Sequence, residues 1–236
     1  MGFFDLEINK ENLENYFKKF IIVSYLKYNE LQKLIDKSKL ETYKTNSVII
    51  EQGEKTNSVY FLVSGTVNVI DYSRVDRTIA YATLSEGEMF GEMAVIDDLP
   101  RSATVTANSN CKVICLPGET FLEIVKSNSD VCFMILKHFS SRIRSIDQRI
   151  TDVVVLSTLQ RACLELVRMS KPDTYKRGNY IIEPMPTQVN LAYMIGSTRE
   201  TVSRILKKLR IESVIIKTKN GYIIPNIQTL EKMYLN

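Results

Sequence analysis

Glycine, carboxylate, arginine and hydroxyl residues lie close together in one short stretch of the chain, at Gly91, Glu92, Arg101 and Ser102. An arginine presents a fork of N–H donors that matches phosphate oxygens, and a serine adds a hydroxyl donor. A glutamate can accept from a sugar hydroxyl, and a glycine lets the backbone approach a ligand closely because it has no Cβ. This combination predicts a site for a ribose and its phosphate. The alternative interpretation is that Glu92 and Arg101 form an ion pair with each other across a turn.

Near the C-terminus, a second group of polar residues follows Gly196 at helical spacing. Arg199 and Arg204 can each bind guanine through two hydrogen bonds, and Glu200 can accept one from a cytosine amino group. Three further cations extend the positive charge toward DNA phosphates, namely Lys207, Lys208 and Arg210. By themselves, the same residues also suit a small helical bundle with a charged solvent-facing surface.

The charge of the chain is distributed unevenly between its two ends. Residues 156–236 hold 13 Lys/Arg and 6 Asp/Glu, whereas residues 1–155 hold 18 Lys/Arg and 21 Asp/Glu. A basic end beside a mildly acidic body indicates that the C-terminal part meets a polyanion such as nucleic acid.

Composition argues against several classes of protein. Four cysteines without a CxxC pair and a single histidine, His138, predict no metal site and no acid–base catalysis by imidazole, so we expect no catalytic residues. Cys111 and Cys115 are expected to be ordinary interior residues, with redox or metal sensing as the alternative. No signal peptide is visible, and the apolar runs are far shorter than the ~20 residues of a membrane span. The sequence therefore predicts a soluble, cytoplasmic protein that is not an enzyme.

The elements that must position these residues change in type along the chain. Residues 10–41 carry apolar side chains at helical spacing, as in Leu13 and Phe17. Between Tyr43 and Pro117, short β-rich runs separated by glycines predict an antiparallel sandwich or roll. The predicted strands are Ser47–Ile50, Val59–Val63, Thr66–Tyr72, Thr78–Leu84, Ser102–Thr106 and Lys112–Leu116.

After Pro117 the pattern becomes helical, first over Glu119–Lys126 and then over about 130–156. The longer helix carries apolar residues at alternating steps of three and four, which is the a/d pattern of a two-helix seam. Because polar residues flank it, this stripe is narrow, which favours pairing in a homodimer over packing on its own domain. The stripe residues are Leu136, Phe139, Ile143, Ile146, Ile150 and Val153.

The last part of the chain has the pattern of a small fold of helices and a hairpin. A predicted helix over 157–169 is followed by two helices within 187–210, separated by Gly196, which permits a sharp turn. Val214–Lys217 and Tyr222–Pro225 flank a turn and predict a hairpin.

The stretch Phe90–Val105 resembles the phosphate-binding cassette of cyclic nucleotide-binding domains, and Ile49–Glu54 with Val59–Gly65 resembles an upstream signature of the same family. The resemblance implies that Glu92 binds the ribose 2′-hydroxyl and that Arg101 pairs with the cyclic phosphate. It implies cAMP as the effector, with cGMP as the alternative, and no other cofactor. The implied ligand-binding residues are Gly91, Glu92, Met93, Ala94, Arg101, Ser102, Ala103 and Asp147.

Two positions depart from the pattern of that family. Thr56 stands where a small residue is usual, but because it lies in a turn we expect it to leave the pocket unaffected. Ile146 stands where bacterial relatives carry a threonine that contacts adenine, which leaves Asp147 as the candidate for that contact. The identity of the base therefore stays open.

The segment Thr187–Leu206 resembles the winged helix-turn-helix of the Crp/Fnr transcription regulators, and the resemblance extends over residues 12–226. It implies an α+β chain with a cyclic nucleotide-binding antiparallel β-roll (jelly-roll) over 1–129, a dimerisation helix over 130–156 and a DNA-binding domain over 157–236. The implied DNA-binding residues are Thr187, Gln188, Ser197, Thr198, Arg199, Glu200, Thr201, Ser203, Arg204 and Lys207.

The resemblance implies a homodimer that binds a palindromic TGTGA-like site in double-stranded DNA under the control of a cyclic nucleotide, with RNA polymerase as a further partner. Iron–sulfur and haem effectors occur in the same family, but the first cysteine is Cys111 and His138 is the single histidine. The other hypotheses are a regulator without an effector, a nucleotide-binding subunit that holds a partner protein, and a phosphodiesterase or cyclase.

Overall fold

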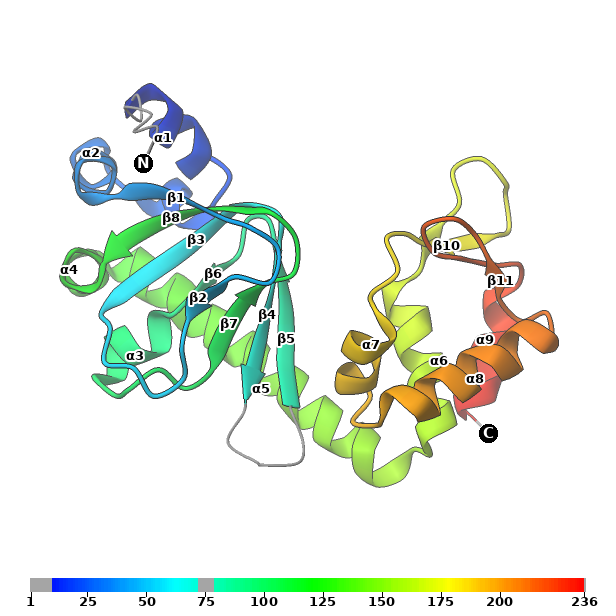
Figure 1. Ribbon diagram of the computed structural model, residues 1–236. Helices are drawn as coiled ribbons and strands as arrows, with labels where there is room; N and C mark the ends of the chain where they lie inside the picture. The colour runs from blue at the N-terminus through cyan, green and yellow to red at the C-terminus, as the bar shows by residue number, and fades with distance from the viewer. Residues whose placement is uncertain (1–9, 72–78, 236) are drawn as a thin grey trace, which may run out of the picture. The chain divides into compact units, whose positions relative to one another are not determined.

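The computed structural model describes residues 10–71 and 79–235 (Figure 1). The chain divides into two compact units, Met1–Ser141 and Arg142–Asn236. The long helix α5 (Ser129–Val155) contributes its N-terminal part to the first unit and its C-terminal part to the second. Both units combine antiparallel sheets with helices, so the fold class is α+β, as predicted.

The first unit is built on two sheets, each of four strands among the described residues. One sheet has the strand order β1 (Lys39–Tyr43), β8 (Cys111–Pro117), β3 (Ser58–Ser64) and β6 (Met89–Phe90). The other has the order β2 (Val48–Ile50), β7 (Thr104–Ala107), β4 (Thr66–Asp71) and β5 (Ile79–Ser85). Side chains from both sheets, such as Leu62 and Val105, share one apolar core between them, which gives the antiparallel roll.

Helices cover the outer face of the sheet that contains β3, where they bury a second apolar core. In this core the rings of Phe17, Phe20 and Phe61 meet edge to face, with centroids 5.2 to 6.5 Å apart. The helices of this unit, besides α5, are α1 (Lys10–Phe17), a 3₁₀ turn (Ile21–Tyr25), α2 (Tyr28–Lys37), α3 (Glu92–Asp97) and α4 (Gly118–Ser127).

The prediction that residues 10–41 are helical is wrong at its end. The strand β1 begins at Lys39 and pairs with β8 in antiparallel register, from Lys39 opposite Cys115 to Tyr43 opposite Cys111. The helical spacing of apolar residues does not decide the structure of this segment, because its backbone is hydrogen-bonded to a distant strand. The short strand β6 was also missed. Tyr72 and Thr78, the predicted ends of two strands, lie outside the described residues.

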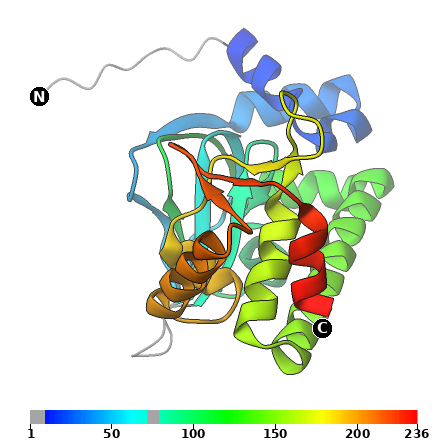
Figure 2. The same cartoon turned by 90° about the vertical axis from the view of Figure 1, so that its right-hand side faces the viewer.

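The second unit packs four helices and a small sheet around its own core, which includes Leu166, Leu191 and Leu209. The view in Figure 2 has α6 and α9 side by side. The helices of the second unit after α5 are α6 (Thr158–Met169), α7 (Gln188–Met194), α8 (Arg199–Ile211) and α9 (Ile227–Leu235). The sheet has the order β11 (Ile216–Lys217), β12 (Tyr222–Ile224), β10 (Tyr180–Ile182) and β9 (Lys171–Pro172).

The two helices around Gly196 and the hairpin after them are therefore present as predicted. The sequence analysis missed α9 and the pairing of β9 with β10. Both rest on contacts with elements far along the chain, since α9 packs on α6 and β10 pairs with β12.

Candidate functional site

The turn between β2 and β3 is bonded to the segment that carries Arg101. The Arg101 backbone N–H donates to the Glu54 carbonyl, and the Arg101 carbonyl accepts from the Gly53 N–H, both at 2.9 Å. Farther along, the Gln52 N–H donates to the Thr104 hydroxyl at 3.1 Å. Two segments that are 50 residues apart in sequence thus form one rigid frame, and the Arg101 side chain starts from it.

Three neutral oxygen atoms surround the Arg101 guanidinium. Its Nε donates to the Thr56 hydroxyl at 2.8 Å. Its two terminal nitrogens donate to backbone carbonyls, Nη1 to Gly91 at 2.6 Å and Nη2 to Ser58 at 2.8 Å. The arginine residue is only 3% exposed. We call these three acceptors the Arg101 cradle.

The cradle gives the buried Arg101 charge neutral direct partners, while the Glu54 and Glu92 carboxylates act on it from a longer distance. Within the described part of the chain, Arg101 forms no ion pair, so the predicted alternative of a Glu92–Arg101 pair across a turn is not what the structure contains. Burial lowers the pKa of Arg101 because the charged form loses hydration. Neutral acceptors replace only part of that hydration, so an anion bound beside the guanidinium would gain a strong electrostatic attraction.

The neighbours of the cradle are arranged by the start of α3. Gly91 precedes this helix with φ +82°, a conformation that favours glycine, and Glu92 is the first residue of α3 and 1% exposed. The ring of Tyr60 stacks on Phe90 with centroids 5.3 Å apart and lies 6.0 Å from the guanidinium carbon of Arg101. A buried carboxylate, a buried guanidinium and a glycine backbone are therefore collected at one end of the roll.

The other predicted ligand residues are less uniform. Ala103 is buried and Ala94 half-buried, whereas Ser102 and Met93 are exposed. Asp147 is exposed on the part of α5 that belongs to the second unit, so its contact with a base stays a prediction. Sequence analysis missed Thr56 as a functional residue, because nothing local shows that a turn residue reaches the Arg101 side chain.

In the second unit, side-chain caps begin both helices of the predicted DNA-reading pair. The Thr187 hydroxyl accepts from the Asn190 N–H at the start of α7, and the Thr198 hydroxyl accepts from the Thr201 N–H at the start of α8. Gly196 lies between them with φ +59°. The turn thus fixes the point at which α8 begins, and with it the position of Arg199.

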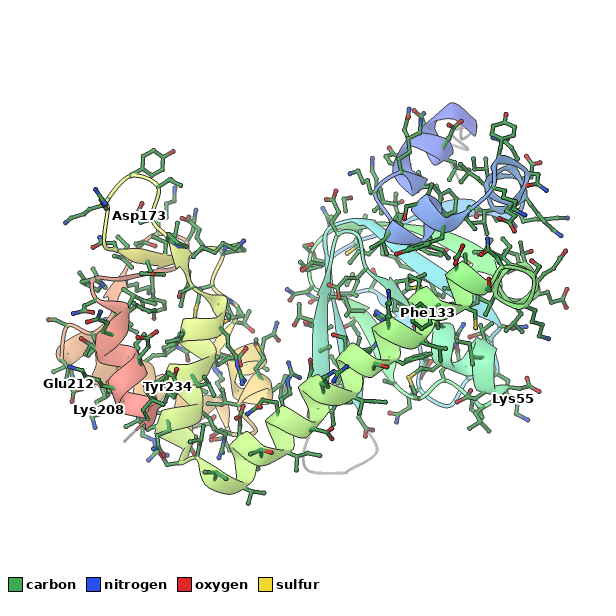
Figure 3. The ribbon with its side chains drawn as sticks, turned by 180° about the vertical axis from the view of Figure 1, so that it is seen from behind. Lys55, Phe133, Asp173, Lys208, Glu212 and Tyr234 are labelled. Carbon is green, nitrogen blue, oxygen red and sulfur yellow. The ribbon has the colours of Figure 1, made fainter. Side chains whose placement is uncertain are left out.

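One side of α8 packs inward through Val202, Leu206 and Leu209, and the other is exposed and mostly cationic. The Arg204 guanidinium donates to the Thr201 hydroxyl at 3.2 Å. The Lys208 ammonium and the Glu212 carboxylate lie 3.9 Å apart (Figure 3). Thr187 and Thr198 are exposed, and Gln188, Ser197 and Thr201 half-buried. The other predicted DNA-binding residues are all exposed: Arg199, Glu200, Ser203, Arg204 and Lys207.

Comparison with known proteins identifies both units. Residues 40–128 match the family model described as cyclic nucleotide-binding domain, and residues 160–233 match the Crp-like helix-turn-helix domain. The cAMP-activated global transcriptional regulator CRP of Pasteurella multocida is 27% identical over 180 residues, covering 75% of this chain and 85% of that protein. This chain belongs to the Crp/Fnr family. It is a DNA-binding transcription regulator with a cyclic nucleotide-binding domain.

Further Crp/Fnr relatives support the assignment. The cAMP-activated regulator Vfr of Pseudomonas aeruginosa is 24% identical over 196 residues, which cover 80% of this chain and 90% of Vfr. Two solved structures share the fold. The c-di-GMP-responsive regulator CLP of Xanthomonas campestris has a TM-score of 0.68 at 20% identity, covering 84% of this chain and 99% of CLP. A CooA mutant from Carboxydothermus hydrogenoformans has a TM-score of 0.70 at 17% identity, covering 84% of this chain and 88% of the CooA chain.

In this Crp/Fnr chain, most of the predicted dimerisation stripe on α5 faces solvent. Leu136, Ile143, Ile146, Ile150 and Val153 are each 54 to 59% exposed. Phe139 of the stripe is half-buried against the core of the first unit, and its part in a dimer seam stays a prediction. The exposed side also includes Phe133, which lies on α5 in Figure 3 with the Lys137 ammonium 4.7 Å from its ring.

A polar cluster joins the end of α5 to α6, and the sequence analysis did not find it. Asp152, near the end of α5, is only 7% exposed. It accepts from Arg168 and from Gln148, both at 2.9 Å. Arg161 of α6 donates to the carbonyls of Leu156 at 2.7 Å and Ile195 at 2.8 Å, and thereby ties the end of α5 to the turn after α7.

Among the described residues, no group of three or more His, Cys, Asp or Glu side chains is placed to hold a metal ion. In the same residues, each helix is too short or too polar to span a bilayer.

Proposed function

We propose that this regulator is a cytoplasmic homodimer that binds a palindromic, TGTGA-like DNA site when a cyclic nucleotide, cAMP, occupies the roll. The effector binds through Arg101 on its phosphate and Glu92 on its ribose 2′-hydroxyl. The exposed stripe of α5 pairs with that of a second copy, and α8 enters the major groove. RNA polymerase is the further partner at the promoter.

The observation that carries the effector proposal is the buried Arg101 charge in a cradle of neutral oxygen atoms. A cyclic phosphate carries one negative charge on oxygens that accept from guanidinium N–H groups, so it would add a direct counter-charge to the more distant Glu54 and Glu92 carboxylates. The buried Glu92 carboxylate stands on the adjacent helix start and suits the sugar. cAMP is favoured over other cyclic nucleotides because the curated relatives CRP and Vfr are cAMP-activated.

Control of DNA binding follows from linkage between the two sites. A ligand that favours one arrangement of the paired α5 helices also sets the spacing of the two α8 helices. Two recognition helices that read adjacent major grooves on one face must lie about one DNA turn apart, ~34 Å. Ligand and DNA then strengthen each other by the same factor, about 1–3 kcal/mol.

The test is calorimetry with cAMP and with cGMP, each followed by an operator-binding assay, with c-di-GMP as a third ligand because the structural neighbour CLP responds to it. We expect cAMP to bind and to tighten operator binding. Equal operator affinity with and without nucleotide would instead indicate a constitutive DNA-binding protein. A purified protein with visible colour would point to a haem or iron–sulfur effector.

Gly91→Ala is expected to weaken cAMP binding about tenfold or more. A Cβ at this position would lie 2.9 Å from Arg101 Nη1 and 3.1 Å from the Ser58 carbonyl, so the guanidinium must move. Calorimetry measures the loss. Gly53→Ala is the matched control: its φ of +84° imposes the same backbone strain, but nothing lies within 4 Å of the added Cβ. Equal losses in the two variants would contradict this explanation.

Arg199→Ala is expected to weaken operator binding by about 1–3 kcal/mol and to relax preference at one base pair, because a base contact is lost. Gel shifts on operators that vary one base pair at a time measure both effects. Lys207→Ala serves as the comparison, since a phosphate contact should weaken all sequences alike and reduce the salt dependence. If Arg199→Ala also weakens every sequence equally, Arg199 contacts phosphate rather than a base.

A further inference from the structure

The three oxygen atoms of the Arg101 cradle differ in kind. Two are backbone carbonyls, of Gly91 and Ser58, which remain whatever the side chain. Among the described residues, the Thr56 hydroxyl is the single side-chain acceptor of the guanidinium. A substitution at Thr56 can therefore remove one oxygen atom of the cradle, whereas the other two belong to the backbone.

The cradle uses part of the hydrogen-bonding capacity of Arg101. A guanidinium has five N–H groups. The bonds that Nε, Nη1 and Nη2 make to the cradle account for three of them. The cradle thus leaves one N–H on each terminal nitrogen unused, and a guanidinium can donate two N–H groups to two oxygens of one phosphate.

Thr56 is held at a fixed place relative to Arg101. It follows directly on the turn whose residues Gly53 and Glu54 bond the Arg101 backbone. Its hydroxyl accepts from Nε, and the guanidinium plane turns about the Cδ–Nε bond that ends at this atom. Together with the carbonyls of Gly91 and Ser58, the hydroxyl holds the plane of the group before any ligand arrives, so less conformational freedom is lost when the ligand binds.

We propose that Thr56 is a positioning residue for the anionic group of the effector: it accepts from Arg101 Nε and so aims the terminal N–H groups at the phosphate. The inference rests on the proposed function, because it names a further residue of the same nucleotide site. The competing explanation is that Thr56 only stabilises its turn, which would change folding stability without changing ligand affinity.

The experiment compares Thr56→Val, Thr56→Ser and the unmodified full-length chain. Valine has nearly the shape of threonine but no hydroxyl, and serine keeps the hydroxyl. Calorimetry with cAMP should show about a tenfold loss for valine and less than about twofold for serine. Thermal unfolding without ligand is measured for all three proteins, and we expect the valine variant to be somewhat less stable because the buried Arg101 Nε loses its acceptor. Should the valine variant fold poorly, Thr56→Ala takes its place.

A spectroscopic readout tests the positioning itself. In ¹⁵N spectra of the unliganded protein, the hydrogen-bonded Arg101 Nε–H should exchange slowly with water. Its signal is assigned by its loss in Arg101→Lys. It should persist in Thr56→Ser and disappear through fast exchange in Thr56→Val.

The outcomes separate this inference from the proposed function. If the unmodified chain binds cAMP and Thr56→Val binds it equally tightly, the role of Thr56 is overturned while the proposed function stands. A loss of affinity in Thr56→Ser as large as in Thr56→Val would also overturn it, because the hydroxyl would not be the cause. If the unmodified chain binds no cyclic nucleotide, the proposed function fails and the inference fails with it.

Discussion

Arg101→Ala is expected to abolish binding of cAMP at micromolar concentrations, as measured by titration calorimetry. The variant removes the one buried cation of the cradle, and with it the charge that we propose binds the cyclic phosphate. Truncating one partner of a buried, hydrogen-bonded charge pair costs about 2–5 kcal/mol, or roughly 30-fold to several thousand-fold in affinity. Unchanged affinity would remove Arg101 from the nucleotide site.

Two controls separate binding from folding in this experiment. Alanine leaves the Gly91 and Ser58 carbonyls without their donor, so thermal unfolding of the variant must be measured alongside. Arg101→Lys keeps the charge but cannot reach three acceptors and a phosphate together, so we also expect weak binding. Lys112→Ala, on an exposed position of β8, removes one positive charge from the same unit and should bind cAMP normally.

The second large effect is expected for the double variant Ile143→Asp with Ile150→Asp, which should be monomeric and bind operator at least about 100-fold more weakly. The two residues are 59% exposed and two helical turns apart on one side of α5. In a dimer, the two aspartates of each copy would together place four carboxylates in the apolar interface, at a cost of several kcal/mol. Analytical ultracentrifugation and gel shifts measure the two consequences.

The matched control for this variant is Val155→Asp. Val155 is 70% exposed at the end of the same helix, but it lies on the side away from the stripe. We expect it to remain dimeric. A monomeric Val155→Asp, or a dimeric double variant with full operator affinity, would show that the stripe is not the seam.

Local sequence signals were sufficient for the elements in which the backbone is bonded to near neighbours. The alternating steps from Leu136 to Val153 predicted the long helix, and Gly196 predicted the turn before α8. The same reasoning failed at Lys39–Glu41 and at α9, where the state of the segment depends on β8 and on α6. Pairing with a strand 70 residues away leaves no periodic trace in the segment itself.

For the site too, the residue types could be interpreted from the sequence, whereas the surroundings of each side chain could not. Arginine, glutamate and glycine at fixed spacing indicated a sugar-phosphate site, because the chemistry of these residue types is intrinsic. Thr56 was expected to leave the pocket unaffected, yet its hydroxyl lies 2.8 Å from Arg101 Nε. Asp152 is buried against Arg168, which no local pattern in the sequence indicated.

The sequence by itself determined the residue types, the helical and strand periods and the uneven charge, since each depends on neighbours within a few positions. Only the tertiary structure decided that the Arg101 charge is buried among neutral oxygen atoms, and that one of these comes from a turn 45 residues earlier. Burial and long-range hydrogen bonds arise from where distant segments meet, and that meeting is fixed by the packing of the whole roll.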